Sequence, residues 1–177
     1  DATLIPDYGQ VRSDNRVLTL PPFEFRFDEN RQFFTEGTEL FNKGGLFYSR
    51  RVGGRPLHFF DVYGNLADNE EVLENPAESQ LINATKVSGR TNGGLGIGVF
   101  NAISAETHAT IKNVETGDKR QVQTSPLTNY NIAVLDQNLP NNSFVTLINT
   151  NVLRRGDDYE ANVTGTTFSL RNKAQSY

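Results

Sequence analysis

Side chains capable of acid, base or anion chemistry are concentrated near the start of this 177-residue chain. They are Glu29, Arg31, Glu36, Arg50 and Arg51. Two carboxylates held about 5 to 10 Å apart could act as acid and base on a glycosidic bond. Alternatively, the arginines could form fixed bidentate pairs with the carboxylates and keep them ionised, whereas a general acid needs a raised pKa. We favour this structural, lumen-facing polar network and predict no catalytic residue.

Aromatic rings are interleaved with these charges. Nine of the twelve phenylalanines precede residue 61, where eight Lys or Arg balance eight Asp or Glu. Four neighbouring rings could form a platform on which a sugar stacks: Phe33, Phe34, Phe47 and Tyr48. Adjacent phenylalanines more often pack into a hydrophobic cluster, and we favour that interpretation.

Other chemically suggestive residues form no complete motif. His58 and His108 lack ligand-like spacing to another His, Asp or Glu, so we expect no metal centre. Ser49 lies in no nucleophile elbow. The run Gly94-Leu95-Gly96-Ile97-Gly98 lacks the spacing of a dinucleotide loop, so we expect no cofactor. Because these glycines fall inside an expected strand, we interpret them as points where another segment approaches a sheet.

The second half of the chain has the period-two alternation of antiparallel strands. The predicted strands are residues 81–91, 95–104, 107–114, 128–137, 144–153 and 159–170, with a polar loop at 115–125. Tight-turn signals at Asn92-Gly93-Gly94 and Leu139-Pro140-Asn141-Asn142 predict two hairpins. In residues 95–104 one predicted face is apolar and the other carries glycines, Phe100 and Ala102. One face of each hairpin therefore suits lipid or a core, and the other is polar or small.

Three regions follow from these patterns. Residues 1–56 form a charged aromatic N-terminal segment, and residues 57–80, with six acids and no Lys or Arg, an acidic exposed loop or short helix. Residues 81–177 hold the antiparallel strands. Within the first region we expect short strands at 17–20 and 23–27, a helix from Phe33 to Phe41, and a strand at 47–52.

Strand length indicates the fold class. Strands of about ten residues exceed the roughly five or six that globular proteins favour, and they fit a bilayer-spanning meander. Closed barrels begin at about eight strands, so the strands counted here form part of a barrel. We predict an all-β fold, the partial antiparallel meander of an outer-membrane-type β-barrel, with the N-terminal segment packed in or against it. A soluble β-sandwich is the alternative.

The amino-acid composition further limits the class of protein and the partners it could have. Hydrophobic residues make up 36% of the chain, as suits strands whose alternate residues face a polar interior. No run of 18 apolar residues is present, which excludes a spanning helix. A net charge of -4 without a basic stripe argues against a nucleic-acid partner. The chain begins with Asp and contains no Met, so we expect that a leader or longer N-terminal region precedes it.

Three blocks occur in order near the start: 6–11 (PDYGQV), 27–37 (FDENRQFFTEG) and 46–53 (LFYSRRVG). Together they resemble the opening of a Bacteroidota family of outer-membrane β-barrels of unknown function. Its members usually follow a family-9-like carbohydrate-binding domain and are often labelled membrane-associated hydrolases. The chain departs from that pattern in having no such upstream domain and too few strands for a full barrel.

The resemblance implies a location in the outer membrane of a Gram-negative bacterium. Implied partners are outer-membrane lipid, glycan through the missing upstream domain, and other envelope proteins. Three functions remain as hypotheses. The first is a non-enzymatic barrel component linked to glycan binding or uptake. The others are a carbohydrate-directed hydrolase using Asp28, Glu29 and Glu36, and a soluble β-sandwich subunit of a surface assembly.

Overall fold

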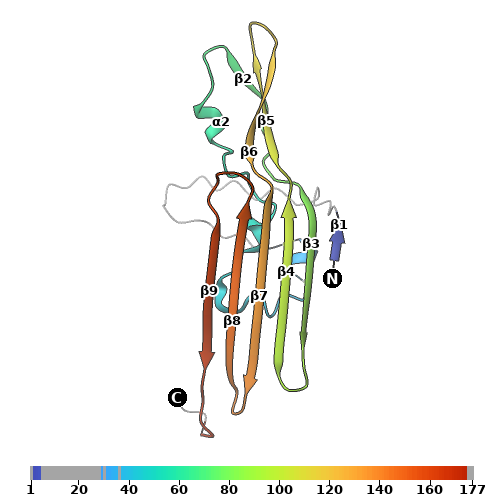
Figure 1. Cartoon of the computed structure of the whole chain (residues 1–177), viewed down its shortest axis with the longest axis vertical. Helices are drawn as coiled ribbons and strands as arrows, with labels where there is room; N and C mark the ends of the chain where they lie inside the picture. Colours follow the sequence, from blue (N-terminus) through green and yellow to red (C-terminus); the bar gives the residue numbers. More distant parts are fainter. Residues whose placement is uncertain (1, 5–28, 30, 36, 175–177) are drawn as a thin grey trace.

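The computed structural model describes residues 2–4, 29, 31–35 and 37–174, and it is all-β with two antiparallel sheets (Figure 1). The larger sheet has six strands in the order β1-β3-β4-β7-β8-β9. These are β1 (Ala2–Leu4), β3 (Leu81–Arg90), β4 (Leu95–Ser104), β7 (Thr128–Leu139), β8 (Ser143–Arg154) and β9 (Ala161–Ser169). The smaller sheet consists of β2 (Glu70–Glu74), β5 (Thr107–Asn113) and β6 (Lys119–Ser125). The predicted all-β antiparallel class is confirmed.

Two long hairpins form the centre of the larger sheet, as predicted. The turn between β7 and β8 places Asn141 and Asn142 at φ 60° and 57°, the left-handed region that both central residues of a type I′ turn occupy, and Ser143 N–H donates to the Pro140 carbonyl at 3.3 Å. Between the hairpins, β4 pairs with β7 without a register shift, from Leu95 opposite Gln137 to Ser104 opposite Thr128. The described sheet does not close, so β1 and β9 are its edges.

The smaller sheet projects from the end of the larger sheet that lies opposite these tight turns (Figure 1). Its β5 and β6 form a hairpin inserted between β4 and β7 in the chain. Their small core is Val62, Ala109 and Ile111, with Val62 supplied by the short helix α2 (Asp61–Gly64).

The sequence predictions missed two strands in this region. Residues 119–125 were predicted as loop but form β6, and the acidic segment contains the strand β2 in addition to the short helix α2. Ion pairs stabilise this sheet across strands, because Arg120 contacts Glu70 at 2.7 Å and Lys112 contacts Glu71 at 3.2 Å. Charges paired in this way give little apolar alternation, which is why the sequence pattern did not indicate strands.

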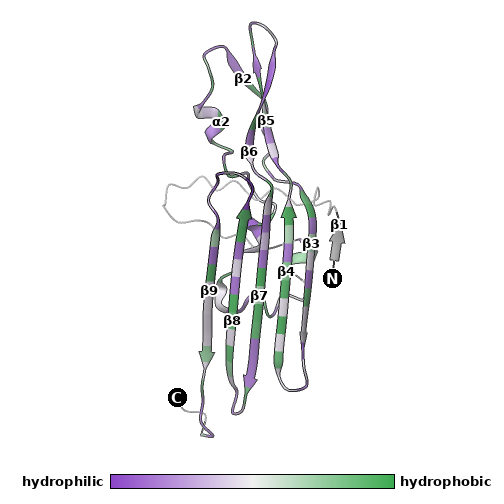
Figure 2. Cartoon of the chain, in the orientation of Figure 1, coloured by the Kyte–Doolittle hydropathy of each residue, from purple (hydrophilic) through white to green (hydrophobic). Residues whose placement is uncertain are grey.

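The larger sheet has two unlike faces, and Figure 2 shows apolar and polar residues alternating along its strands. We call the face covered by residues 31–54 the inward face and the opposite one the outward face. The inward core contains Leu81, Ala84, Phe100, Ala102, Ile132, Val134 and Ile148 from the strands, and Phe34, Leu40, Phe41 and Val52 from the covering segment. Exposed apolar residues of the outward face include Val87, Ile97, Val99, Leu135, Leu147 and Phe168.

The covering segment packs on the sheet without pairing as a strand. It contains α1 (Gln32–Thr35) and the 3₁₀ turns η1 (Lys43–Gly45) and η2 (Ser49–Arg51). The predicted helix is therefore confined to one turn, and the predicted strand at 47–52 is wrong. Both differ because the segment is held by aromatic packing and side-chain hydrogen bonds, which impose no regular period. The strands expected at 17–20 and 23–27 lie outside the described residues.

Glycines of the inward face let this segment approach closely. A Cβ on Gly96 would lie 3.0 Å from Leu40 Cδ2, and one on Gly98 would lie 3.1 Å from the Phe41 ring. The expectation that these glycines admit another segment is confirmed.

Gly98→Val should therefore destabilise the protein, because the added side chain would overlap the Phe41 ring. Overpacking of this kind costs about 1–3 kcal/mol. The control is Gly89→Val on the outward face, where a Cβ meets nothing within 4 Å. Denaturant titration should show a lower midpoint for Gly98→Val alone. Equal midpoints for the two variants would contradict this packing.

Candidate functional site

The most highly organised polar site lies between the covering segment and the inward face. Its first part is centred on Arg31, which is 8% exposed. Arg31 Nε and Nη2 donate to the two carboxylate oxygens of Glu29 at 2.9 and 2.8 Å. Its Nη1 and Nη2 also donate to the backbone carbonyls of Val52 and Ser49, at 2.7 and 2.8 Å. One guanidinium therefore closes residues 29–52 into a compact loop.

The carboxylate of Glu29 is held in its charged form. Burial raises the pKa of Glu29, but hydrogen bonds from Arg31 and from the Ser49 hydroxyl outweigh it and leave the pKa below its ordinary value. A carboxyl group with a lowered pKa is a poor general acid near neutral pH. The geometry therefore suits anchoring of the segment.

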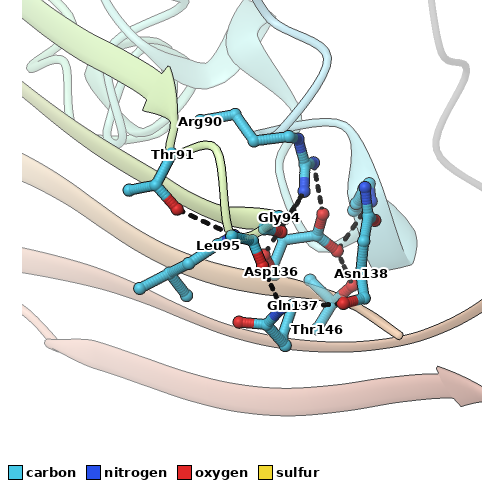
Figure 3. Close-up of polar contacts among 10 residues, drawn as sticks. Arg90, Thr91, Gly94, Leu95, Asp136, Gln137, Asn138 and Thr146 are labelled. Carbon is cyan, nitrogen blue, oxygen red and sulfur yellow. Dashed lines mark hydrogen bonds and ion pairs between the residues drawn. The ribbon is translucent and has the colours of Figure 1, made fainter. Parts of the chain in front are cut away.

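The second part of the site joins the segment to the sheet through Asp136, whose side chain is fully buried. Lys43 Nζ, from η1, donates to its carboxylate at 2.6 Å. Arg90 from β3 and Thr146 from β8 donate to the same group, Thr146 at 2.6 Å (Figure 3). Asp136 thus connects three strands and the covering segment, and its buried charge is compensated by two cations.

Aromatic packing fills the space between these polar anchors. Phe33, Phe34, Phe41 and Phe47 surround the ring of Phe100, with centroid distances of 5.4 to 6.4 Å. Lys86 from β3 lies over the Phe33 ring and donates to the Phe33 carbonyl. The segment is therefore fixed to the inward face by charge, hydrogen bonds and rings together.

The structure describes four of the five residues of the predicted polar network. Glu29 and Arg31 pair directly. Arg50 is half-buried and Arg51 is exposed in η2, and no described ion pair joins either of them to Glu29. Glu36 lies outside the described residues.

The four rings of the suggested aromatic platform are partly or fully buried. Phe34 is buried, and Phe33 and Phe47 pack against the core around Phe100. Tyr48 is half-buried just before η2. Phe33, Phe34 and Phe47 therefore contribute to the packing between the covering segment and the sheet.

Sequence reasoning missed Asp136, Lys43 and Arg90 as site residues. A detectable signal was present, because Asp136 interrupts the apolar alternation of Ile132 and Val134 on one face of its strand. A single acid at an inward position implies a cationic partner. The partner in the covering segment is 93 residues away, and one sequence alone does not reveal such a pairing.

A second polar contact joins the start of α2 to the β8–β9 connection. His58 Nδ1 lies 2.8 Å from Asp61, and its Nε2 lies 2.7 Å from Asp158. Hydrogen bonds to Asp61 and then Asp158 raise the pKa of His58, against a smaller effect of burial. A shallow cavity of about 220 Å³ adjoins this contact and includes Arg120 in its lining.

Two further findings concern the described residues alone. No group of three or more His, Cys, Asp or Glu among them could hold a metal ion. None of the described helices is long and apolar enough to span a membrane.

A family model described as "Domain of unknown function (DUF5916)" matches residues 1–177. Searches of curated proteins and of solved structures gave no match.

Asp136→Asn should loosen the covering segment, because Lys43 and Arg90 lose their shared anion. Since both cations retain partial exposure, we expect a loss of about 1–3 kcal/mol rather than the larger cost of a fully buried pair. Trypsin cleavage after Lys43 should become faster. The control is Asp118→Asn, in the exposed turn between β5 and β6. Cleavage as slow in Asp136→Asn as in the control would show that the anchor is not needed.

The His58 contact should depend on pH. Because the folded pKa is raised, its stabilising contribution is complete below the unfolded value of about 6.5 and is lost as pH rises through the folded pKa. Hydrogen exchange, corrected for intrinsic rates, should show residues 155–160 protected at low pH and less protected at high pH. Asp158→Asn should weaken this dependence, and unchanged protection across the range would refute it.

Proposed function

On the premise that this chain belongs to the DUF5916 family of unknown function, we propose that it forms part of the wall of an outer-membrane-type β-barrel. In this proposal the covering segment acts as a plug on the lumen side and the outward face contacts lipid. The component is non-enzymatic, resides in the outer membrane of a Gram-negative cell, and is linked to glycan binding or uptake. Further proposed partners are outer-membrane lipid and other envelope proteins.

The observation that carries the proposal is the placement of charge on the larger sheet. The outward positions of β3, β4, β7, β8 and β9 are Asn83, Thr85, Val87, Gly89, Leu95, Ile97, Val99, Asn101, Ile103, Asn129, Asn131, Ala133, Leu135, Gln137, Leu139, Ser143, Val145, Leu147, Asn149, Asn151, Leu153, Asn162, Thr164, Thr166 and Phe168. No charged residue occurs at these described positions. Lys86, Arg90 and Asp136 all lie on the inward face.

This distribution is the reverse of that in a water-soluble sheet. Charged residues normally occupy the solvent face, and contiguous exposed apolar area is small. Here Val87, Val99 and Phe168 are 64%, 52% and 67% exposed on the uncharged face. Lipid contact removes the cost of exposing such a face to water, and transmembrane barrels have this apolar-out, polar-in alternation.

A soluble sandwich would cover the outward face with a second sheet. The smaller sheet instead projects from the end of the larger one (Figure 1). The exposed apolar side chains of Val87, Val99 and Phe168 on the outward face favour lipid contact over a sandwich partner.

The connections and edges fit the same proposal. Tight turns join the hairpins at one end, and the longer connections lie at the other, as in outer-membrane barrels. The six described strands are fewer than the roughly eight of the smallest barrels, so we propose that further strands complete the wall beyond β1 and β9.

The carboxylate chemistry favours this function over a hydrolase. Glu29 and Asp136 are each bound by cationic side chains. Such pairing stabilises ionised carboxylates in fixed positions, whereas a glycosidase needs one protonated acid beside an ionised partner.

Fractionation of the native protein would test the proposal. We expect the protein to remain in outer membranes after a carbonate wash and to shift its gel mobility on heating. Release into the soluble fraction without a mobility shift would overturn it.

Two matched substitutions separate lipid contact from water contact. Val99 on the outward face and Val114 beyond β5 are 52% and 53% exposed. Val99→Lys should impair membrane assembly, because a lysine facing lipid costs up to about 2–4 kcal/mol near the midplane. Val114→Lys should be neutral, as for an exposed position in water. Equal assembly of the two variants, measured by the heat-shifted fraction, would contradict lipid contact at Val99.

A further inference from the structure

A row of asparagines crosses the outward face in direct register. Asn101 of β4 is opposite Asn131 of β7, which is opposite Asn151 of β8, which is opposite Asn162 of β9. We call these four residues the amide row. From the amide row, we infer a binding surface for the uncharged sugar headgroup of a glycolipid whose acyl chains lie on the neighbouring apolar rows. This inference rests on the proposed function.

Hydrogen bonds organise the amide row from within. Asn101 Nδ2 donates to Asn131 Oδ1 at 2.8 Å and to Asn129 Oδ1 at 2.7 Å, while Asn131 Nδ2 lies 3.5 Å from Asn151 Oδ1. Asn149 Nδ2 donates to Asn162 Oδ1 at 2.9 Å. These bonds fix the amide planes, so a ligand meets an ordered surface.

Several amide donors remain for a ligand. Among the described hydrogen bonds, none uses the NH₂ group of Asn129, Asn151 or Asn162 as donor. Each of these groups can donate two hydrogen bonds, and hydrocarbon provides no acceptor. A polar ligand at this level would satisfy them.

The position of the amide row along the strands corresponds to the border between the apolar band of the membrane and the lipid headgroups. Eight residues separate Leu139, at the tight turn, from Asn131. At a rise of about 3.4 Å per residue and a tilt of about 40°, this corresponds to roughly 20 Å along the membrane normal. The apolar band of such a barrel is about 25 Å tall, so the amide row lies near its upper border. The long connections lie beyond the row, which places it toward the outer leaflet.

The chemistry of the face selects an uncharged headgroup. Sugar hydroxyls both donate and accept hydrogen bonds, as amides do. A phosphate is anionic and is recognised chiefly by Arg or Lys, and the described outward positions contain neither. Below the row, Ile97, Leu135 and Leu147 are aligned across three strands and provide an apolar surface for acyl chains.

The test uses the full protein in phosphatidylcholine vesicles that contain equal small fractions of digalactosyldiacylglycerol and phosphatidylglycerol. Native mass spectrometry counts the lipids retained, and vesicle flotation with heat-modifiability reports membrane assembly separately. We expect the galactolipid to be retained in preference to phosphatidylglycerol. Asn131→Leu with Asn151→Leu should reduce its retention about tenfold, because the Asn151 donors are lost and Asn131 no longer orders the row. Asn138→Leu, at the tight-turn end of β7, is the matched control.

Each alternative outcome is distinguishable. Equal retention of both lipids by the wild type, or preference for phosphatidylglycerol, would overturn the inference while leaving the barrel intact. A dimer that the double variant abolishes would assign the row to self-association and also overturn it. If the double variant fails to assemble, Asn131→Ser replaces it, and full galactolipid retention in that variant counts against the inference. Failure of the wild type to float with vesicles would refute the proposed function and this inference with it.

Discussion

The structure depends on the compensation of one buried negative charge, the carboxylate of Asp136. Asp136 is fully buried near the tight-turn end of the central strand β7, where an unpaired carboxylate would be strongly destabilising. Lys43 and Arg90 compensate it, and Lys43 comes from the covering segment. The sheet therefore needs that segment in place, and Arg31 holds the segment in a compact shape through Glu29 and two backbone carbonyls. The aromatic cluster around Phe100 packs between the segment and the sheet.

Placing charge on the inward face has a consequence for the opposite face. Once Lys86, Arg90 and Asp136 point toward the segment, alternation directs uncharged residues outward along the same strands. That face carries aliphatic rows near the tight turns and asparagines above them. A single inside-out pattern thus accounts for the plug-like segment and for the proposed contact with lipid.

The sequence was sufficient for the hairpins but not for the segment that covers them. Period-two alternation and the turn signals at Asn92-Gly93-Gly94 and Asn141-Asn142 located β3, β4, β7 and β8, because strand pairing in a hairpin is local. The strands β2 and β6 escaped detection because charge pairs, not apolar alternation, stabilise them. The pairing of Glu29 with Arg31 was predictable from the sequence, since the two residues are only two positions apart. The pairing of Lys43 with Asp136 was not predictable, because that contact depends on how the covering segment packs across the sheet.

Depth-dependent fluorescence quenching tests the central claim most directly, namely that the outward face contacts lipid. The chain contains no cysteine, so single cysteines at Leu135, Leu147 and Val114 can each carry a fluorophore in the full protein in vesicles. Lipids bearing a quencher on the acyl chain should quench the label at Leu135 and Leu147 strongly and the label at Val114 weakly, with the reverse order for a water-soluble quencher. Labels at Leu135 and Leu147 that respond to the aqueous quencher alone would contradict the account.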